Sequence, residues 1–365
     1  MIKTHEAFLN AGANIISTNT YQAHHELFRK HIPDMKDSEL NSHLIMEDAV
    51  TFADQAIQNV TGLGRRKNKL IAGNFLFHEK LLFFWENKLI KIAGSVGPYG
   101  ACQGDGSEYT GSYVNNSMTR ESLKEWHKDR IKRLTFKNSV NIIAAETIPS
   151  YIEALAILDA LEDFPGTRCW ISFQCKDEIH TAKGEPIDLA FKEILNHPLA
   201  LKIKAVGVNC VKPSEVSPLL KRMNLVNNVK SWPNNDFFQK IPYVVYPNSG
   251  EEWDAVNKIW IGSSQNLIKN IPEWMELGAN IIGGCCRVGP ELIRQIKEEI
   301  VFHSYDISLK RCQNSEKQPL ETWSYVQKTL TKPSYEEMKE RLQSAKEFFR
   351  DADEGNFEFH EKNNS

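Results

Sequence analysis

Short apolar segments that alternate with helical stretches are the feature that most constrains the fold of this chain. Each segment spans only a few residues and is followed by small or polar residues. Such runs are typical of strands buried on both faces, and strands that alternate with helices form a parallel sheet. The chain has 365 residues, a length that suits a single (β/α)8 barrel, so the predicted fold class is an α/β barrel. The seven segments are 14–18, 92–96, 141–145, 169–173, 205–208, 243–246 and 280–282.

The composition argues against several classes of protein. The net charge is -3, and charged residues of both signs make up 25% of the chain. This charge balance does not predict a positively charged surface that would bind nucleic acid or an anionic membrane. An odd number of cysteines, seven, favours a reducing compartment over a disulfide framework. The first residues lack the apolar core of a secretory signal, and the most apolar stretch, 75–84, is too short to span a bilayer. We therefore expect a cytoplasmic protein.

Two adjacent cysteines in a glycine turn, with a third cysteine at another strand end, indicate a metal site. Cys285 and Cys286 follow two glycines after the segment 280–282, and Cys210 lies just beyond the segment 205–208. Because the carboxyl ends of parallel strands meet at one edge of a sheet, we expect the three thiols to lie together. Three thiolates with one position left over suit a catalytic zinc, so the predicted cofactor is Zn²⁺.

Two roles other than zinc binding are open to the cysteines. A single buried cysteine is usually a small apolar filler, and this interpretation is preferred for Cys169, Cys175 and Cys312. It suits the adjacent pair less well, because core packing does not require two glycines before it. A disulfide between neighbouring cysteines would be strained. Zinc remains the preferred interpretation for the three cysteines at the strand ends.

Polar side chains follow the same predicted strands. Glu146 ends the segment 141–145, and a buried carboxylate there needs a partner. It is either a receptor for a substrate ammonium group or an N-cap or ion-pair partner for the next helix. Tyr21, which follows the first segment, either contacts substrate or packs, and Asn209 directly precedes one of the cysteines. Glu108 lies in an acidic loop, where carboxylates are more often solvated than functional.

Taken in chain order, the motifs at these strand ends resemble one family. The chain is similar to the zinc-dependent homocysteine S-methyltransferases from about residue 4 to about residue 300, in particular to the branch that uses S-methylmethionine or S-adenosylmethionine. The combination of GVNC with GGCC is specific to it. The motifs are STNTYQA, AGSVGPYGA, DGSEYTGSY, ETIPS, GVNC, VVYPNSGE and GANIIGGCCRVGPELIRQI.

This resemblance implies a (β/α)8 barrel that transfers a methyl group from a sulfonium donor to homocysteine, giving methionine. It also implies that Tyr21 and Glu146 fall where the family contacts homocysteine. The chemistry of the thiol agrees, because a thiol of pKa about 8.5 loses its proton when it binds zinc. The predicted site residues are the zinc ligands Cys210, Cys285 and Cys286 and the substrate-binding residues Tyr21, Glu146 and Asn209.

Two features depart from the family pattern. The Asp-Gly-Ala/Gly loop that follows the family's first strand does not occur, and Met1 falls inside the helix that would come next. Residues 74–91 form an insert between two copies of Ile-Ala-Gly. We therefore expect an incomplete barrel without its first strand, and a chain that is weakly active or inactive. Adding a family-like first strand and deleting 74–91 is expected to raise activity.

The alternation of strands and helices stops near His303. This change predicts a homocysteine-binding barrel domain over residues 1–302 and a C-terminal extension over 303–365, with a helical segment and a disordered tail. Two further functions stay open. One is a non-catalytic zinc-binding relative, and the other is a thiol methyltransferase with another acceptor or a corrinoid donor.

Overall fold

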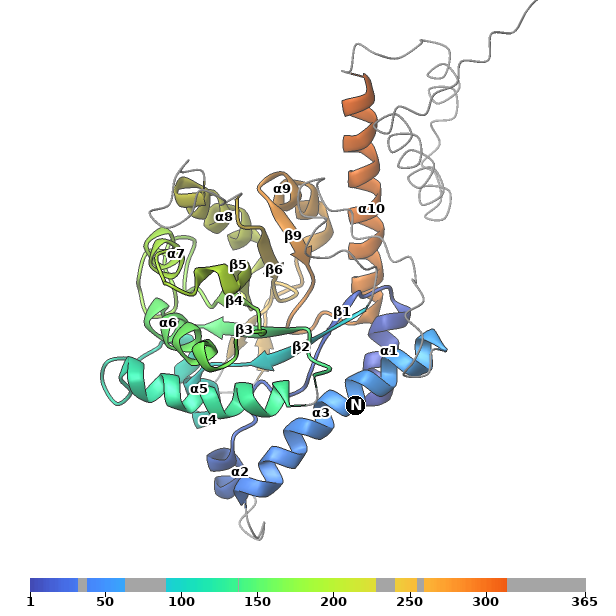
Figure 1. Cartoon of the computed structure of the whole chain (residues 1–365). Coiled ribbons are helices and arrows are strands. Elements are labelled where there is room, and N and C mark those ends of the chain that lie inside the picture. Colours follow the sequence, from blue (N-terminus) through green and yellow to red (C-terminus); the bar gives the residue numbers. More distant parts are fainter. Residues whose placement is uncertain (32–37, 63–89, 137, 228–239, 255–258, 314–365) are drawn as a thin grey trace, which may run out of the picture. The chain divides into compact units, whose positions relative to one another are not determined.

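Parallel strands and the helices between them make up the described part of this chain (Figure 1). The computed structural model describes residues 1–31, 38–62, 90–136, 138–227, 240–254 and 259–313. Within these residues, seven strands form one sheet in the order β1-β2-β3-β4-β5-β6-β9. Each of the seven predicted segments coincides with one of them. The strands are β1 (Ile15–Ser17), β2 (Lys91–Val96), β3 (Ile142–Ile148), β4 (Cys169–Phe173), β5 (Ile203–Asn209), β6 (Tyr243–Tyr246) and β9 (Ala279–Ile282).

The sheet curls into an incomplete (β/α)8 barrel. Every neighbouring pair of strands is parallel, as expected when helices form the crossovers. β1 and β9 are the end strands, and no strand within the described ranges pairs with both of them to close the barrel. The predicted α/β fold with an incomplete barrel is confirmed.

Helices cover the outer face of the sheet. α3 and α5 contact β2, α6 contacts β3, α8 contacts β5 and α9 contacts β9. Ser150 begins α6 as its N-cap, because its hydroxyl accepts a hydrogen bond from the N–H of Ile152 at 3.1 Å. The helices are α1 (Ile2–Asn10), α2 (His25–His31), α3 (Ser38–Thr61), α4 (Tyr99–Gln103), α5 (Arg120–Thr135), α6 (Tyr151–Ala160), α7 (Ile187–Leu195), α8 (Pro213–Asn227), α9 (Ile271–Glu276) and α10 (Pro290–Gln313). Short 3-10 helices are η1 (Ser107–Tyr109), η2 (Leu161–Asp163), η3 (Ala200–Lys202) and η4 (Leu267–Asn270).

The concave face of the sheet has an apolar layer to which all seven strands contribute. Within the described ranges no helix residue belongs to this layer, so it lies inside the curl. Its members are Ala93, Ile142, Ala144, Trp170, Ala205, Val244 and Ile281, with Ile15 and Tyr246 packed against them. Because successive side chains of a strand point to opposite faces, Ser95, Glu146 and Ser172 share this face at the next position toward the carboxyl ends.

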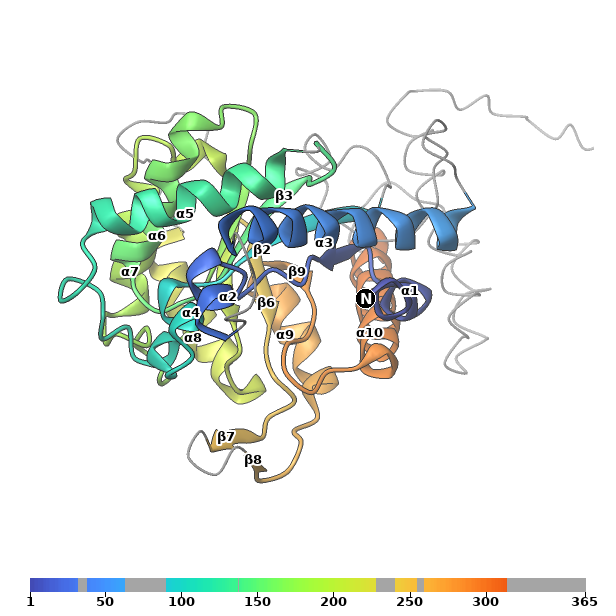
Figure 2. The same cartoon turned by 90° about the horizontal axis from the view of Figure 1, so that it is seen from below.

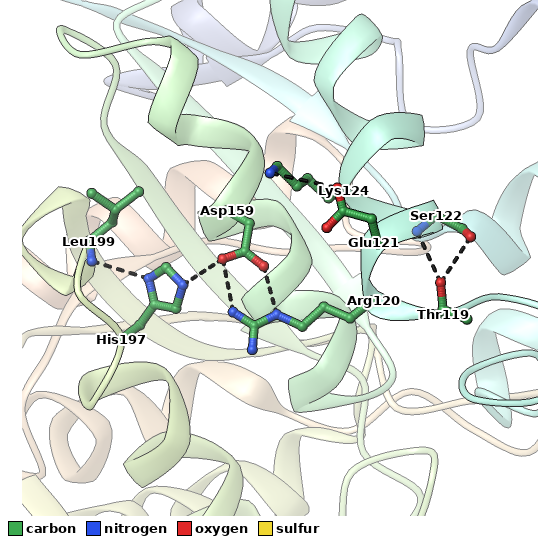
Figure 3. Close-up of polar contacts among 8 residues, drawn as sticks. All are labelled: Thr119, Arg120, Glu121, Ser122, Lys124, Asp159, His197 and Leu199. Carbon is green, nitrogen blue, oxygen red and sulfur yellow. Dashed lines mark hydrogen bonds and ion pairs between the residues drawn. The ribbon is translucent and has the colours of Figure 1, made fainter.

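Polar contacts tie the outer helices α5 and α6 to the turn after α7 (Figure 3). Arg120 Nε and Nη2 donate to the two carboxylate oxygens of Asp159 at 2.6 and 2.8 Å. His197 Nε2 lies 2.9 Å from Asp159 Oδ1, while its Nδ1 accepts a hydrogen bond from the N–H of Leu199. The acceptor role of Nδ1 places the proton on Nε2, so the imidazole donates to Asp159.

An antiparallel hairpin interrupts the alternation between β6 and η4. Its strands are β7 (Glu252–Asp254) and β8 (Ile259–Ile261), and it extends away from the barrel strands in the view of Figure 2. Among the helices that the structure describes, none is both long enough and apolar enough to cross a membrane.

The chain divides into two compact units. The first contains the sheet and runs to Ile296; the second begins at Lys297 and, among the described residues, comprises the rest of α10. α10 is continuous through residues 302 and 303, and the division into a barrel domain and an extension there stays a prediction. The insert at 74–91 lies outside the described residues except for its last two, and Lys91 begins β2. Residues 314–365 and the side chain of Cys312 also lie outside them.

Candidate active site

The three cysteines predicted to bind zinc lie together at the carboxyl ends of their strands. Cys210 follows β5, and Cys285 and Cys286 follow β9. Cys286 Sγ is 3.9 Å from Cys210 Sγ and 3.9 Å from Cys285 Sγ, and all three sulfurs lie within 4.8 Å of one another. By contrast, Cys169 and Cys175 are buried apart from this group, as expected for apolar fillers.

Backbone hydrogen bonds bring the two cysteine segments to the end of β6, the strand between β5 and β9. The N–H of Cys285 donates to the carbonyl of Pro247 at 2.8 Å, and the N–H of Cys210 donates to that of Tyr246 at 3.3 Å. Gly284 is required for the turn, because a Cβ there would lie 2.1 Å from a methyl carbon of Val288. The glycine of the motif thus lets the chain place two consecutive thiols at one point.

The spacing of the sulfurs fits zinc. Tetrahedral zinc with Zn–S bonds of about 2.3 Å separates its thiolates by about 3.8 Å. The observed 3.9 Å separations match this value within a tenth of an ångström. Hydrogen bonds from Cys210 and Cys285 lower the pKa of Cys286, so one thiolate is favoured even before a cation adds its charge. Cys210, Cys285 and Cys286 are thus a suitable donor set for zinc, which would leave a fourth position for a substrate.

Glu146 projects into the barrel beside the thiols. Its carboxylate accepts hydrogen bonds from the hydroxyl groups of Ser95 and Tyr246. Burial raises its pKa, and the charge of Cys286 raises it further. The interpretation of Glu146 as the N-cap of the next helix is wrong, because Ser150 caps α6. This carboxylate is therefore left to face the barrel interior.

A hydrogen-bond network that was not predicted from the sequence holds Tyr246 beside Glu146. The Tyr246 hydroxyl lies 2.5 Å from Ser172 Oγ and accepts a hydrogen bond from Trp170 Nε1 at 3.1 Å. Residues two apart on a strand point to the same face of the sheet, and this spacing was the sequence signal for the network. Trp170 and Ser172 share one face of β4, just as Ala144 and Glu146 share one face of β3.

The structure places Asn209 beneath the site, where it holds the backbone after β3. Asn209 is 1% exposed, and its amide accepts from the N–H of Thr147 at 2.7 Å and donates to its Oγ1 at 2.8 Å. Thr147 has φ 62°, which is costly for a β-branched residue. Asn209 therefore stabilises a strained residue directly after Glu146, and its role as a substrate ligand stays a prediction.

Tyr21 both packs and lies near the thiols. Its ring fills the space beside Gly97, where a Cβ would lie 2.5 Å from a ring carbon. Its hydroxyl forms a hydrogen bond with the Thr147 side chain, and Cys210 lies close enough for its charge to raise the tyrosine pKa, although burial is the main cause. Packing is thus shown, and contact with substrate stays a prediction.

The loop after β2 brings Glu108 and Tyr109 to the site. Burial raises the pKa of Tyr109, and the charges of the three clustered cysteines and of Glu108 raise it further. The expectation that Glu108 is solvated is wrong, because its side chain is 8% exposed. The buried carboxylate of Glu153 anchors this loop by accepting hydrogen bonds from the N–H of Tyr99 at 2.7 Å and the hydroxyl of Tyr113 at 2.5 Å.

A buried arginine joins the loops that follow β1 and β2. Arg130 on α5 is fully buried, and its guanidinium donates to the carbonyls of Gly97 at 2.6 Å and Tyr21 at 2.7 Å. It also donates to the carbonyls of Thr20 and Ala23, at 3.1 Å each. These contacts hold the backbone of Tyr21 against the loop that carries Glu108. No motif marked Arg130, because its partners are backbone atoms far away in the sequence.

Comparisons with known proteins identify the family to which this chain belongs. The family model for homocysteine S-methyltransferase matches residues 1–300. A betaine-homocysteine S-methyltransferase of Drosophila melanogaster is 35% identical over 306 residues, 82% of this chain and 83% of that protein. Homocysteine S-methyltransferase 2 of Arabidopsis thaliana is 32% identical over 305 residues, 81% of each protein. The metallated form of the Escherichia coli homocysteine methyltransferase MmuM has a TM-score of 0.60 at 26% identity, over 81% of this chain and 83% of that one.

The matched residues include both cysteine motifs, the strands that carry them and the loops that surround them. The resemblance to homocysteine S-methyltransferases is thereby confirmed over residues 1–300. The chain belongs to the homocysteine S-methyltransferase family, enzymes that transfer a methyl group to homocysteine.

Proposed function

We propose that this chain is a zinc-dependent enzyme that methylates homocysteine to methionine, with S-methylmethionine or S-adenosylmethionine as donor. The observation that carries the proposal is the group of three sulfurs within 4.8 Å of one another, with Cys286 Sγ 3.9 Å from each of the other two, which suits three thiolate ligands of one zinc ion. The metallated form of the E. coli relative supports the use of a metal in this family. We assign the reaction to the predicted barrel domain, 1–302, in the reducing cytoplasm where free thiols persist.

The chain's own residues would bind and orient homocysteine. Zinc, when bound, would take the substrate thiol at its fourth position and lower its pKa so that it is ionised at neutral pH. Glu146 would accept hydrogen bonds from the substrate ammonium group, held in place by Ser95 and Tyr246. Tyr21 would close the site on the β1 side, and Asn209 would keep the backbone next to Glu146 in position.

The transfer itself needs little acid-base chemistry. The homocysteine sulfur attacks the methyl carbon of the sulfonium donor, and the new S–C bond forms as the donor's S–CH₃ bond breaks. The bonding electron pair stays on the donor sulfur, which leaves as a neutral thioether. Positioning of the two sulfurs in line would therefore provide most of the rate enhancement.

An assay of methionine formation with zinc-loaded protein tests the proposal. We expect a low rate of methionine formation from homocysteine with a sulfonium donor, because the barrel is incomplete, and loss of at least 90% of that activity, about a tenfold effect, with a chelator or in Cys285→Ala. Betaine is assayed beside the two sulfonium donors, because the Drosophila relative is named for it. Zinc binding without methionine from any donor would overturn the proposal and favour a non-catalytic zinc-binding relative.

A second variant tests the role of Glu146. Because the carboxylate charge is proposed to bind the substrate ammonium group, Glu146→Gln should raise the KM for homocysteine about tenfold or more and leave the zinc content unchanged. An unchanged KM for homocysteine would contradict the assignment of Glu146 while leaving the proposed reaction intact.

A further inference from the structure

Glu108 is a buried carboxylate, one oxygen of which has no hydrogen-bond partner among the residues that the structure describes. It lies in η1, between Ser107 and Tyr109, and its side chain is more than nine-tenths buried. In the part of the chain that the structure describes, no donor forms a hydrogen bond with its Oε2. Buried polar groups are nearly always hydrogen-bonded, because an unpaired one costs several kcal/mol. Among the described residues, Oε2 therefore lacks the hydrogen-bond donor that a buried oxygen requires.

The position of Glu108 connects it with the proposed reaction. The next residue, Tyr109, lies within electrostatic range of Cys210, Cys285 and Cys286, and Tyr21 lies within range of Cys210 and Glu108. The backbone of Glu108 is fixed against α4, since a Cβ at Gly100 would lie 2.6 Å from its nitrogen. The carboxylate therefore belongs to the loop that borders the thiols, and it is held there by close packing.

We propose that Glu108 binds the α-ammonium group of the methyl donor and thereby selects amino-acid sulfonium donors over betaine. The inference rests on the proposed function. An unpaired carboxylate oxygen needs an N–H donor, which the ammonium group of S-methylmethionine or S-adenosylmethionine provides. The quaternary ammonium of betaine carries no N–H group and leaves the oxygen unpaired.

The two carboxylates, Glu146 and Glu108, then bind different substrates. Glu146 accepts hydrogen bonds inside the barrel from Ser95 and Tyr246 and serves homocysteine, the acceptor. Glu108 serves the donor, whose methyl group must reach the homocysteine sulfur. Burial raises the pKa of Glu108 and so favours its neutral form, whereas a cation bound beside it would favour the carboxylate. A site built for two amino acids thus has one carboxylate for each ammonium group.

Calorimetry on the zinc-loaded full chain tests this assignment. The probes are S-methylmethionine and dimethylsulfoniopropionate, which has the same dimethylsulfonium and carboxylate groups but no amine. Glu108→Gln should raise the Kd for S-methylmethionine about tenfold or more, because it replaces a charged hydrogen bond by a neutral one. It should leave the Kd values for dimethylsulfoniopropionate and homocysteine within about twofold of wild type, because neither uses this carboxylate.

Asp105→Asn is the matched control, because it makes the same change of charge in the same loop at an exposed residue whose oxygen accepts from the N–H of Ser107. It should leave the Kd for S-methylmethionine unchanged. An equal loss of affinity in both variants, or for both probes, would show a general charge effect and overturn the inference.

The inference and the proposed function can fail separately. If wild type makes methionine from S-methylmethionine but Glu108→Gln binds that donor normally, only the inference is overturned. If wild type binds no sulfonium donor, both are overturned. Glu108→Asp covers the case in which Glu108→Gln does not fold, because it keeps the charge while moving the carboxylate back by one methylene. Wild-type affinity for S-methylmethionine in Glu108→Asp would also overturn the inference.

Discussion

Several polar side chains are buried in this protein, although polar residue types are usually exposed to solvent. Glu108, in an acidic loop, is buried, and Arg130 is fully buried among carbonyl groups. His24 is also buried, at 4% exposed, and it caps the start of α2 by accepting a hydrogen bond from the N–H of Glu26 at 3.3 Å. None of these roles follows from residue type, because each depends on partners or neighbours brought together by folding.

His24 should make the protein sensitive to mild acid. Burial first, and then the charges of His25 and Arg130, lower its pKa from 6.5 to about 3. Above pH 6.5 the imidazole is neutral in both states and has no effect. As the pH falls from 6.5 toward 3, the unfolded chain takes up a proton that the folded chain does not, so stability is lost, by about 1.4 kcal/mol at pH 5.5.

Comparison with His24→Asn measures this effect. Asparagine retains an N-cap acceptor and does not titrate. Urea unfolding at pH 7.5 and 5.5 should show a smaller acid-induced loss of free energy of unfolding in His24→Asn, by about 1.4 kcal/mol. The same loss in both proteins would mean that the His24 pKa is not lowered in the folded state.

At the scale of elements, each apolar segment of the sequence forms a strand of the sheet. Contacts between neighbouring strands also restrict which residues fit at some positions, and these restrictions cannot be read from one segment alone. Gly207 lies in the middle of β5, in a run that reads as an ordinary buried strand. A Cβ there would lie 1.7 Å from the carbonyl oxygen of Val244 on β6. The glycine is therefore needed for the approach of β5 to β6, the two strands whose ends carry Cys210 and the anchor of Cys285.

Gly207→Ala should destabilise the fold strongly. The added methyl group would force the backbones of β5 and β6 apart, at a cost of about 3 kcal/mol or more, because overpacking against backbone relaxes poorly. The midpoint of urea unfolding measures the loss. Gly166→Ala is the control, since a Cβ there meets nothing within 4 Å, and its midpoint should stay near that of wild type. Equal midpoints for the two variants would refute the close approach of the strands.

At the scale of the whole molecule, the proposed zinc site would cross-link parts of the chain that are far apart in sequence. Cys210 and Cys286 are separated by 76 positions, and their sulfurs by 3.9 Å. A ligand that binds only the folded state raises the free energy of unfolding by mass action. In an incomplete barrel, with β1 and β9 at the ends of the described sheet, such a cross-link joins β9 to β5.

Removal of zinc should therefore lower the melting temperature. A chelator should reduce the Tm of the zinc-loaded protein by about 4 °C or more, a loss of at least about 1–2 kcal/mol for a domain of this size. Cys286→Ala, which lacks one of the three thiols, should start from a lower Tm and show little further change with the chelator. A Tm that the chelator leaves unchanged in both proteins would argue against a zinc ion at the three cysteines.

The positions of the cysteines and of Glu146 could be predicted from the sequence, because short segments of sequence identify the strands that carry them. Cys210, Cys285 and Cys286 follow recognisable strands, and parallel strands always end at the same edge of a sheet, so their convergence follows from spacing alone. The position of Glu146 at that edge follows in the same way. Its hydrogen bonds with Ser95 and Tyr246 could not be predicted, because a hydrogen bond between strands depends on the register of the strands and the curl of the sheet.

The sequence by itself determined the parallel strands, the strand ends that carry the thiols and the family to which the chain belongs. These are local properties, set by the hydrophobicity and spacing of neighbouring residues along the chain. Only the tertiary structure decided that Asn209 supports Thr147, that Arg130 holds the carbonyls of two loops and that Glu108 is buried with its Oε2 unpaired among the described residues. Burial and pairing are properties of the packed molecule, because the groups that exclude water from a side chain come from distant parts of the sequence.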